Sequence, residues 1–90
     1  MNYITFNEII DRLRASMIYS DIKTQTDSLY RLSKDVYNSR DYLGPCSSFI
    51  LESISLLADM INNNRCVYFR NEIIDTCERI CSIITHLKIR

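Results

Sequence analysis

The hydrophobic positions of this chain repeat at helical spacing, and the most apolar stretch runs from Ser48 to Ile61. At 3.6 residues per turn, one line of this stretch holds Ile50, Ile54, Leu57 and Ile61. Further apolar residues lie elsewhere around the cylinder, at Phe49, Leu51, Leu56, Ala58 and Met60. The polar strip is narrow, at Glu52, Ser55 and Asp59. We therefore predict a central helix that needs cover from at least two neighbours.

An amphipathic helix is predicted before it, beginning at Thr5. Thr5 and Glu8 fit a capping box, and Ile4 and Ile9 occupy the two positions of a hydrophobic staple. The apolar stripe continues at Phe6, Ile10, Leu13 and Met17. This pattern predicts a helix that ends near Tyr19.

The segment from Ser20 to Thr26 has two interpretations. Its low helix propensity predicts a break or kink, followed by a second helix from about Thr26 to Asn38 that Thr26 or Asp27 would cap. The core face of that helix would hold Leu29, Leu32 and Val36. Alternatively, Ile22 joins these residues in one long helix whose buried face shifts around the axis.

Turn signals separate the remaining elements. Gly44 and Pro45 predict a turn into the central helix, with Ser47 or Ser48 as its N-cap, and the Asn-rich run after Ile61 predicts a second turn. A final helix is expected from about Cys66 to Leu87, with a stripe at Ile73, Cys77, Ile80, Ile84 and Leu87. The whole pattern predicts an all-α fold, an up-and-down antiparallel bundle of three to four helices that forms one domain over residues 1–90.

Composition narrows the classes of function. Eleven basic and eleven acidic residues cancel, so no global field favours nucleic acid or an anionic membrane. A single Gly and a single Pro disfavour a β-sandwich or barrel, and no apolar run reaches the length of about 18 residues typical of a membrane span. The first residues lack the basic and apolar regions of a secretory signal, so we expect a cytoplasmic protein.

Four cysteines have three interpretations. A disulfide pair suits a secreted protein, and a zinc site needs closely spaced ligands, whereas Cys46 and Cys66 are isolated and Cys77 and Cys81 are four residues apart. The favoured interpretation is that Cys77 and Cys81 act as small buried hydrophobic residues. We predict no metal and no cofactor.

Catalytic groups are sparse. The carboxylate pairs Glu8–Asp11 and Asp75–Glu78 fall on predicted solvent faces, and no glycine-rich loop is present to hold a phosphate. The spacing of Arg79 and the only histidine, His86, resembles the Arg-x(4–6)-His pair of small helical ribonucleases of the HEPN class. Arg79 is followed by Ile rather than by a polar residue, and the chain is short for that class. We therefore predict that the protein is not an enzyme.

Protein binding is the favoured function, because tyrosine and arginine are enriched in binding hot spots. The predicted protein-binding residues are Tyr30, Lys34, Tyr37, Arg40, Tyr42 and Tyr68. The alternative role for these rings is structural, packed at the core edge under a solvated hydroxyl. The partner would be a foreign protein or a second copy in a homodimer, which would cover the central helix. A small nucleic-acid-binding regulator is the competing class, disfavoured because the 38–47 connection is long for a helix-turn-helix.

The order of elements around Tyr42-Leu43-Gly44-Pro45, a helix, this turn, an apolar helix, a polar turn and a final helix, resembles that of the small helical immunity proteins. Those proteins protect bacteria from their own bacteriocins. The resemblance covers about half of the chain and includes no diagnostic motif. It implies a non-enzymatic protein-binding module of the inhibitor, immunity or adaptor type.

Overall fold

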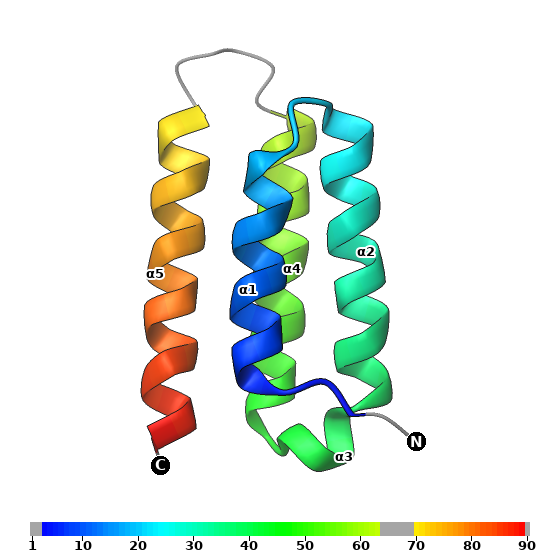
Figure 1. Cartoon of the computed structure of the whole chain (residues 1–90), viewed down its shortest axis with the longest axis vertical. Coiled ribbons are helices and arrows are strands. Elements are labelled where there is room, and N and C mark those ends of the chain that lie inside the picture. Colours follow the sequence, from blue (N-terminus) through cyan, green and yellow to red (C-terminus); the bar gives the residue numbers. More distant parts are fainter. Residues whose placement is uncertain (1–2, 64–69, 90) are drawn as a thin grey trace.

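The computed structural model describes residues 3–63 and 70–89, and nearly all of them are helical (Figure 1). The helices are α1 (Phe6–Ile18), α2 (Ile22–Asn38), α3 (Arg40–Leu43), α4 (Cys46–Asn63) and α5 (Arg70–Ile89). The all-helical prediction is confirmed. The number of helices differs from the expected three to four, because the short helix α3 occupies part of the predicted turn.

Four long helices lie side by side, and Figure 1 shows that each runs in the opposite direction to the one before it. Helix α1 packs against α2 and α5, and α4 packs against the same two helices. In Figure 1, α4 lies behind α1, with α2 to the right and α5 to the left. The central helix of the sequence therefore has a long neighbour on each side and α1 across the core.

One hydrophobic core joins these four helices. Its fully buried side chains include Ile9 and Leu13 of α1, Leu29, Leu32 and Val36 of α2, Ile50 and Leu57 of α4, and Ile84 of α5. Each such side chain contributes about 1.5–3 kcal/mol when it leaves water. The predicted core lines of the four long helices are thus the lines that meet in the structure.

The N-cap of α1 is confirmed at Thr5. Its hydroxyl oxygen accepts a hydrogen bond from the backbone N–H of Glu8 at 3.1 Å, as the Thr–Glu spacing predicts. The helix ends at Ile18, one residue before the expected Tyr19.

The predicted break after α1 is present, but the predicted start of the second helix is wrong. Helix α2 begins at Ile22 rather than near Thr26, and its N-cap is Asp21 rather than Thr26 or Asp27. Thr26 instead lies buried within the helix, where its hydroxyl donates to the carbonyl of Ile22 at 3.0 Å. A single long helix through this region is also wrong, because residues 19–21 are not helical.

The predicted N-cap of the central helix is also wrong. Gly44 adopts the expected positive φ, 79°, where it ends α3. Helix α4 then begins at Cys46, so Ser47 and Ser48 lie inside its first turn and neither is the N-cap.

In α5 the predicted stripe is buried at Ile73, Cys77, Ile80 and Ile84 and half-buried at Leu87. The predicted start of this helix at Cys66 lies outside the described residues.

Candidate protein-binding surface

Three of the predicted binding residues lie along one line of α2. Tyr30, Lys34 and Tyr37 are spaced by four and three residues, so they follow one another along the helix surface. The two tyrosines are 63% and 54% exposed, and Lys34 is exposed as well. Both rings are therefore too exposed to have the alternative, structural role of packing at the core edge.

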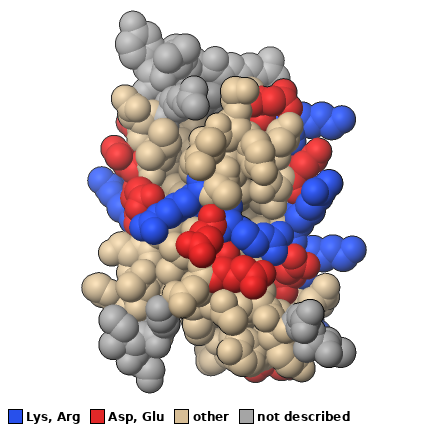
Figure 2. Space-filling model, in the orientation of Figure 1, with Lys and Arg blue, Asp and Glu red and all other residues tan. Residues whose placement is uncertain are grey.

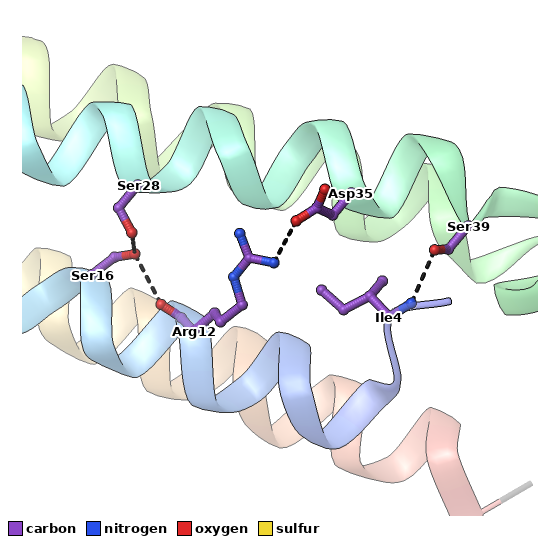
Figure 3. Close-up of polar contacts among 6 residues, drawn as sticks. All are labelled: Ile4, Arg12, Ser16, Ser28, Asp35 and Ser39. Atoms are coloured by element: carbon purple, nitrogen blue, oxygen red, sulfur yellow. Dashed lines mark hydrogen bonds and ion pairs between the residues drawn. The ribbon is translucent and has the colours of Figure 1, made fainter. Parts of the chain in front are cut away.

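Contacts on the opposite flank of α2 show to which side of the helix Tyr30, Lys34 and Tyr37 face. Ser28 lies 2.7 Å from Ser16 of α1, and Asp35 accepts from Arg12 of α1 at 2.6 Å, so this flank faces α1 (Figure 3). Tyr30 and Tyr37 lie about 160° around the helix from Ser28 and Asp35. Since α2 packs between α1 and α4, the two rings lie on its α4 side.

Arg40 in α3 extends the line beyond the end of α2. Its guanidinium carbon lies 4.1 Å from the centroid of the Tyr37 ring. The same guanidinium donates a hydrogen bond to the Tyr37 carbonyl oxygen at 2.9 Å. The cation and the exposed ring therefore hold each other in one orientation.

Tyr42, also in α3, stacks on Tyr3. The ring centroids are 5.2 Å apart and the ring planes differ by 7°. Tyr3 is held there because the next residue, Ile4, is buried and donates its backbone N–H to the hydroxyl of buried Ser39 at 3.0 Å (Figure 3). Tyr3 was not among the predicted residues, and no local pattern signals it, because its partner is 39 residues away in the chain.

We name these residues the tyrosine surface: Tyr3, Tyr30, Lys34, Tyr37, Arg40 and Tyr42. Tyr30, Lys34, Tyr37 and Arg40 form one line, and Tyr42 shares α3 with Arg40. Tyr68, the remaining predicted binding residue, lies outside the described residues.

Neither cation of the tyrosine surface forms an ion pair in residues 3–63 and 70–89. The ion pairs there join α1 to α2 and to α5, and Figure 2 shows charged side chains in a band across the face that carries α1. In this band Arg12 pairs with Asp35, and Arg14 binds Glu78 through two hydrogen bonds of 3.1 and 3.0 Å. Lys34 and Arg40 therefore have no carboxylate partner among the described residues.

A hollow of about 330 Å³ lies between the end of α1 and the start of α2. It is lined by Arg12, Tyr19, Thr24, Asp27, Ser28 and Arg31. Arg12 already binds Asp35, and the lining adds one further carboxylate, Asp27, and one further guanidinium, Arg31, so the hollow has no strong net charge. We assign it no ligand.

The cysteines of α5 follow the favoured interpretation, with Cys77 and Cys81 buried as free thiols. The neighbouring Cys81 side chain, together with burial, raises the pKa of the Cys77 thiol. Cys46 is half-buried and free, whereas Cys66 is outside the described residues. Within the described ranges, no group of His, Cys, Asp and Glu side chains is arranged to hold a metal ion.

The remaining polar candidates lie on exposed helix surfaces and do not line the hollow between α1 and α2. Arg79 and His86 are exposed on α5, and the carboxylates of Glu8, Asp11 and Asp75 are exposed on their helices. In the part of the chain that the structure describes, no helix has the length and apolar character needed to cross a membrane. No protein-family model, curated protein or solved structure matches this chain.

Proposed function

We propose that this chain is a non-enzymatic protein-binding module that captures its partner with the tyrosine surface. The observation that carries the proposal is the Arg40 guanidinium stacked on the exposed ring of Tyr37. Arginine and tyrosine are, with tryptophan, the residue types enriched in the hot spots of protein interfaces. The inhibitor, immunity and adaptor types share this mode of action and differ in their target.

Preorganisation is the physical reason for this choice. A partner that binds free side chains pays about 0.5–1.5 kcal/mol for each flexible group that it immobilises. The Tyr37–Arg40 and Tyr3–Tyr42 contacts hold four of these groups in place before binding. The rings supply large apolar contact area, and Lys34 and Arg40 supply charge that no carboxylate of the described residues neutralises.

The proposed scaffold is a single up-and-down antiparallel bundle, in which α2 and α3 present the surface and α1 and α4 brace α2 from both sides. We place the protein in the cytoplasm.

Site-specific photo-crosslinking tests the proposal. A photoreactive phenylalanine replaces Tyr30 or Tyr37 in one set of variants, and replaces exposed Asp75 or Ser82 of α5 in a matched control set. The variants are irradiated in cells of the organism that naturally produces the protein. We expect a discrete protein adduct only when the photoreactive residue is at Tyr30 or Tyr37 of α2. Lys34→Glu together with Arg40→Glu is expected to remove that adduct.

The class of the adduct distinguishes the alternatives. An adduct that protease removes and nuclease leaves intact supports a protein partner. A nuclease-sensitive adduct overturns the proposal in favour of the nucleic-acid-binding regulator, since exposed rings interleaved with cations also suit single-stranded nucleic acid. Equal labelling from Tyr37 and Asp75, or none from either α2 position, also overturns it.

A further inference from the structure

The stacked rings of Tyr3 and Tyr42 are two phenols held against each other at the surface. Their centroids are 5.2 Å apart and their planes differ by 7°. Tyr3 is 46% exposed and Tyr42 is 56% exposed. In residues 3–63 and 70–89, no other two tyrosine rings stack on each other. Each of these two phenols is therefore open to a small solute and has a second phenol beside it.

Separate anchors hold the two rings in place. Tyr3 precedes buried Ile4, whose backbone N–H is bonded to the Ser39 hydroxyl at 3.0 Å (Figure 3). Tyr42 lies in α3 and precedes buried Leu43. Both rings are exposed, so each can tilt about its own side-chain bonds while the backbone stays where it is.

Two adjacent phenols have a chemistry that a single phenol lacks. Loss of one electron and one proton from a tyrosine O–H gives a radical that is shared with the ring carbons next to the hydroxyl-bearing carbon. Two such radicals join through a bond between these ring carbons, and the hydrogens of the two carbons return to the oxygens. Free radicals must first diffuse together, whereas groups already held side by side avoid that cost.

Tyr30 and Tyr37 are exposed as well but lack this arrangement. They are seven residues apart, which is about 10 Å along α2. The Arg40 guanidinium also lies over the Tyr37 ring, and its positive charge opposes removal of an electron from that ring. Exposure alone therefore does not make either residue equivalent to Tyr3 or Tyr42.

We propose that Tyr3 and Tyr42 form a site of oxidative cross-linking, at which a haem peroxidase with hydrogen peroxide joins the two rings as dityrosine. One carbon–carbon bond forms between the rings. The peroxide accepts the two electrons and two protons that the phenols lose, and it leaves as two water molecules. The product closes residues 3–42 into a covalent loop that contains α1 and α2. This modification needs no partner protein and does not depend on the proposed function.

Peroxidase treatment of the full chain at low micromolar concentration tests the proposal. Tyr3 and Tyr42 are the only tyrosines in the tryptic peptides 1–12 and 41–65, so mass spectrometry identifies their linkage without ambiguity. From the monomer fraction we expect these two peptides joined, with the loss of two hydrogen atoms and with dityrosine fluorescence. The fraction of chains cross-linked should not change with protein concentration, because both radicals belong to one molecule.

Matched phenylalanine variants remove a phenol and keep a ring for stacking. Tyr3→Phe and Tyr42→Phe are each expected to lower the dityrosine yield of the monomer by about tenfold or more. Tyr30→Phe is the control that leaves the yield unchanged. Dityrosine that persists in the Tyr3→Phe monomer overturns the proposal, as does a wild type that gives no dityrosine or gives it only in covalent dimers.

Thermal unfolding of the purified cross-linked monomer shows whether the linkage captures the folded arrangement. We expect its Tm to exceed that of equally treated Tyr3→Phe by about 10 °C, because a covalent link restricts the unfolded chain. An equal or lower Tm would mean that the linkage distorts the fold, and it would overturn the assignment of the native stack as the reacting pair. Failure of either measurement is distinct from failure of the photo-crosslinking at α2.

Discussion

Hydroxyl side chains occupy positions where the helical pattern calls for apolar residues. Ser16, Thr26 and Ser53 are buried, and each donates a hydrogen bond to a backbone carbonyl of the preceding turn, at 2.8–3.0 Å. Such a bond satisfies the hydroxyl inside its own helix and needs no partner from another element. In the described residues, no buried side-chain nitrogen or oxygen lacks a hydrogen bond.

Asp21 gives the residue-scale prediction. Its carboxylate accepts from the backbone N–H of Thr24 at 2.9 Å and from the Thr24 hydroxyl at 2.8 Å, and these bonds lower its pKa. The cap therefore stabilises the fold above the unfolded-state pKa of about 4, and this contribution is lost as pH falls through the lower folded-state pKa. We expect Asp21→Ala to lower the Tm by a few degrees at neutral pH.

Thermal unfolding followed by circular dichroism between neutral and acidic pH measures this effect. The difference in Tm between wild type and Asp21→Ala should shrink below about pH 4. Asp21→Asn is the control, because an asparagine caps helices without titrating. A difference that stays constant with pH would show that the charged carboxylate is not the stabilising form.

At the scale of the element, periodicity predicted the helices better than their ends. The four long helices follow the apolar lines of the sequence, whereas the start of α2 was misplaced because Ser20 and Thr24 interrupt the apolar stripe and Thr26 resembles a cap. In the structure the helix continues through Thr26, which is buried and whose hydroxyl donates a hydrogen bond to the carbonyl oxygen of Ile22. Helix α3 was missed since it is only four residues long.

Two adjacent leucines of α4 make the element-scale prediction. Leu57 is fully buried between the helices, and Leu56 is half exposed. Leu57→Ala is expected to lower the free energy of unfolding by about 2–5 kcal/mol because it leaves a cavity in the core. Leu56→Ala is the matched control, with a loss below about 1 kcal/mol in the monomer.

Urea unfolding at the lowest practical protein concentration measures both values, so that self-association does not add to the apparent stability. Similar losses in the two variants would contradict the assignment of Leu57 to the core and Leu56 to the surface.

At the scale of the whole molecule, contacts between distant parts of the chain determine which candidate binding residues lie together. The sequence predicted Tyr30, Lys34, Tyr37, Arg40 and Tyr42 as separate candidates, and the first three share a line through local periodicity alone. The stacking of Tyr42 on Tyr3 depends on the bond between Ile4 and Ser39, which are 35 residues apart. No pattern within one helix contains that information.

Ser39→Ala is the whole-molecule prediction. It leaves the backbone N–H of buried Ile4 without its acceptor, and we expect the free energy of unfolding to fall by about 1–3 kcal/mol. Ser55→Ala, at an exposed serine of α4, is the control with little effect. Urea unfolding compares the two, and equal losses would contradict a role for Ser39 in fastening the segment before α1.

The stack of Tyr3 on Tyr42 also determines how the protein should be handled. Anything attached ahead of Tyr3 leaves the bundle beside α3, next to the rings and cations of the tyrosine surface (Figure 1). A purification tag or fluorescent protein fused there would crowd the surface that we expect a partner to occupy. The end of α5 lies on the other side of the same end of the bundle, so a fusion at the C-terminal end leaves those side chains open to a partner.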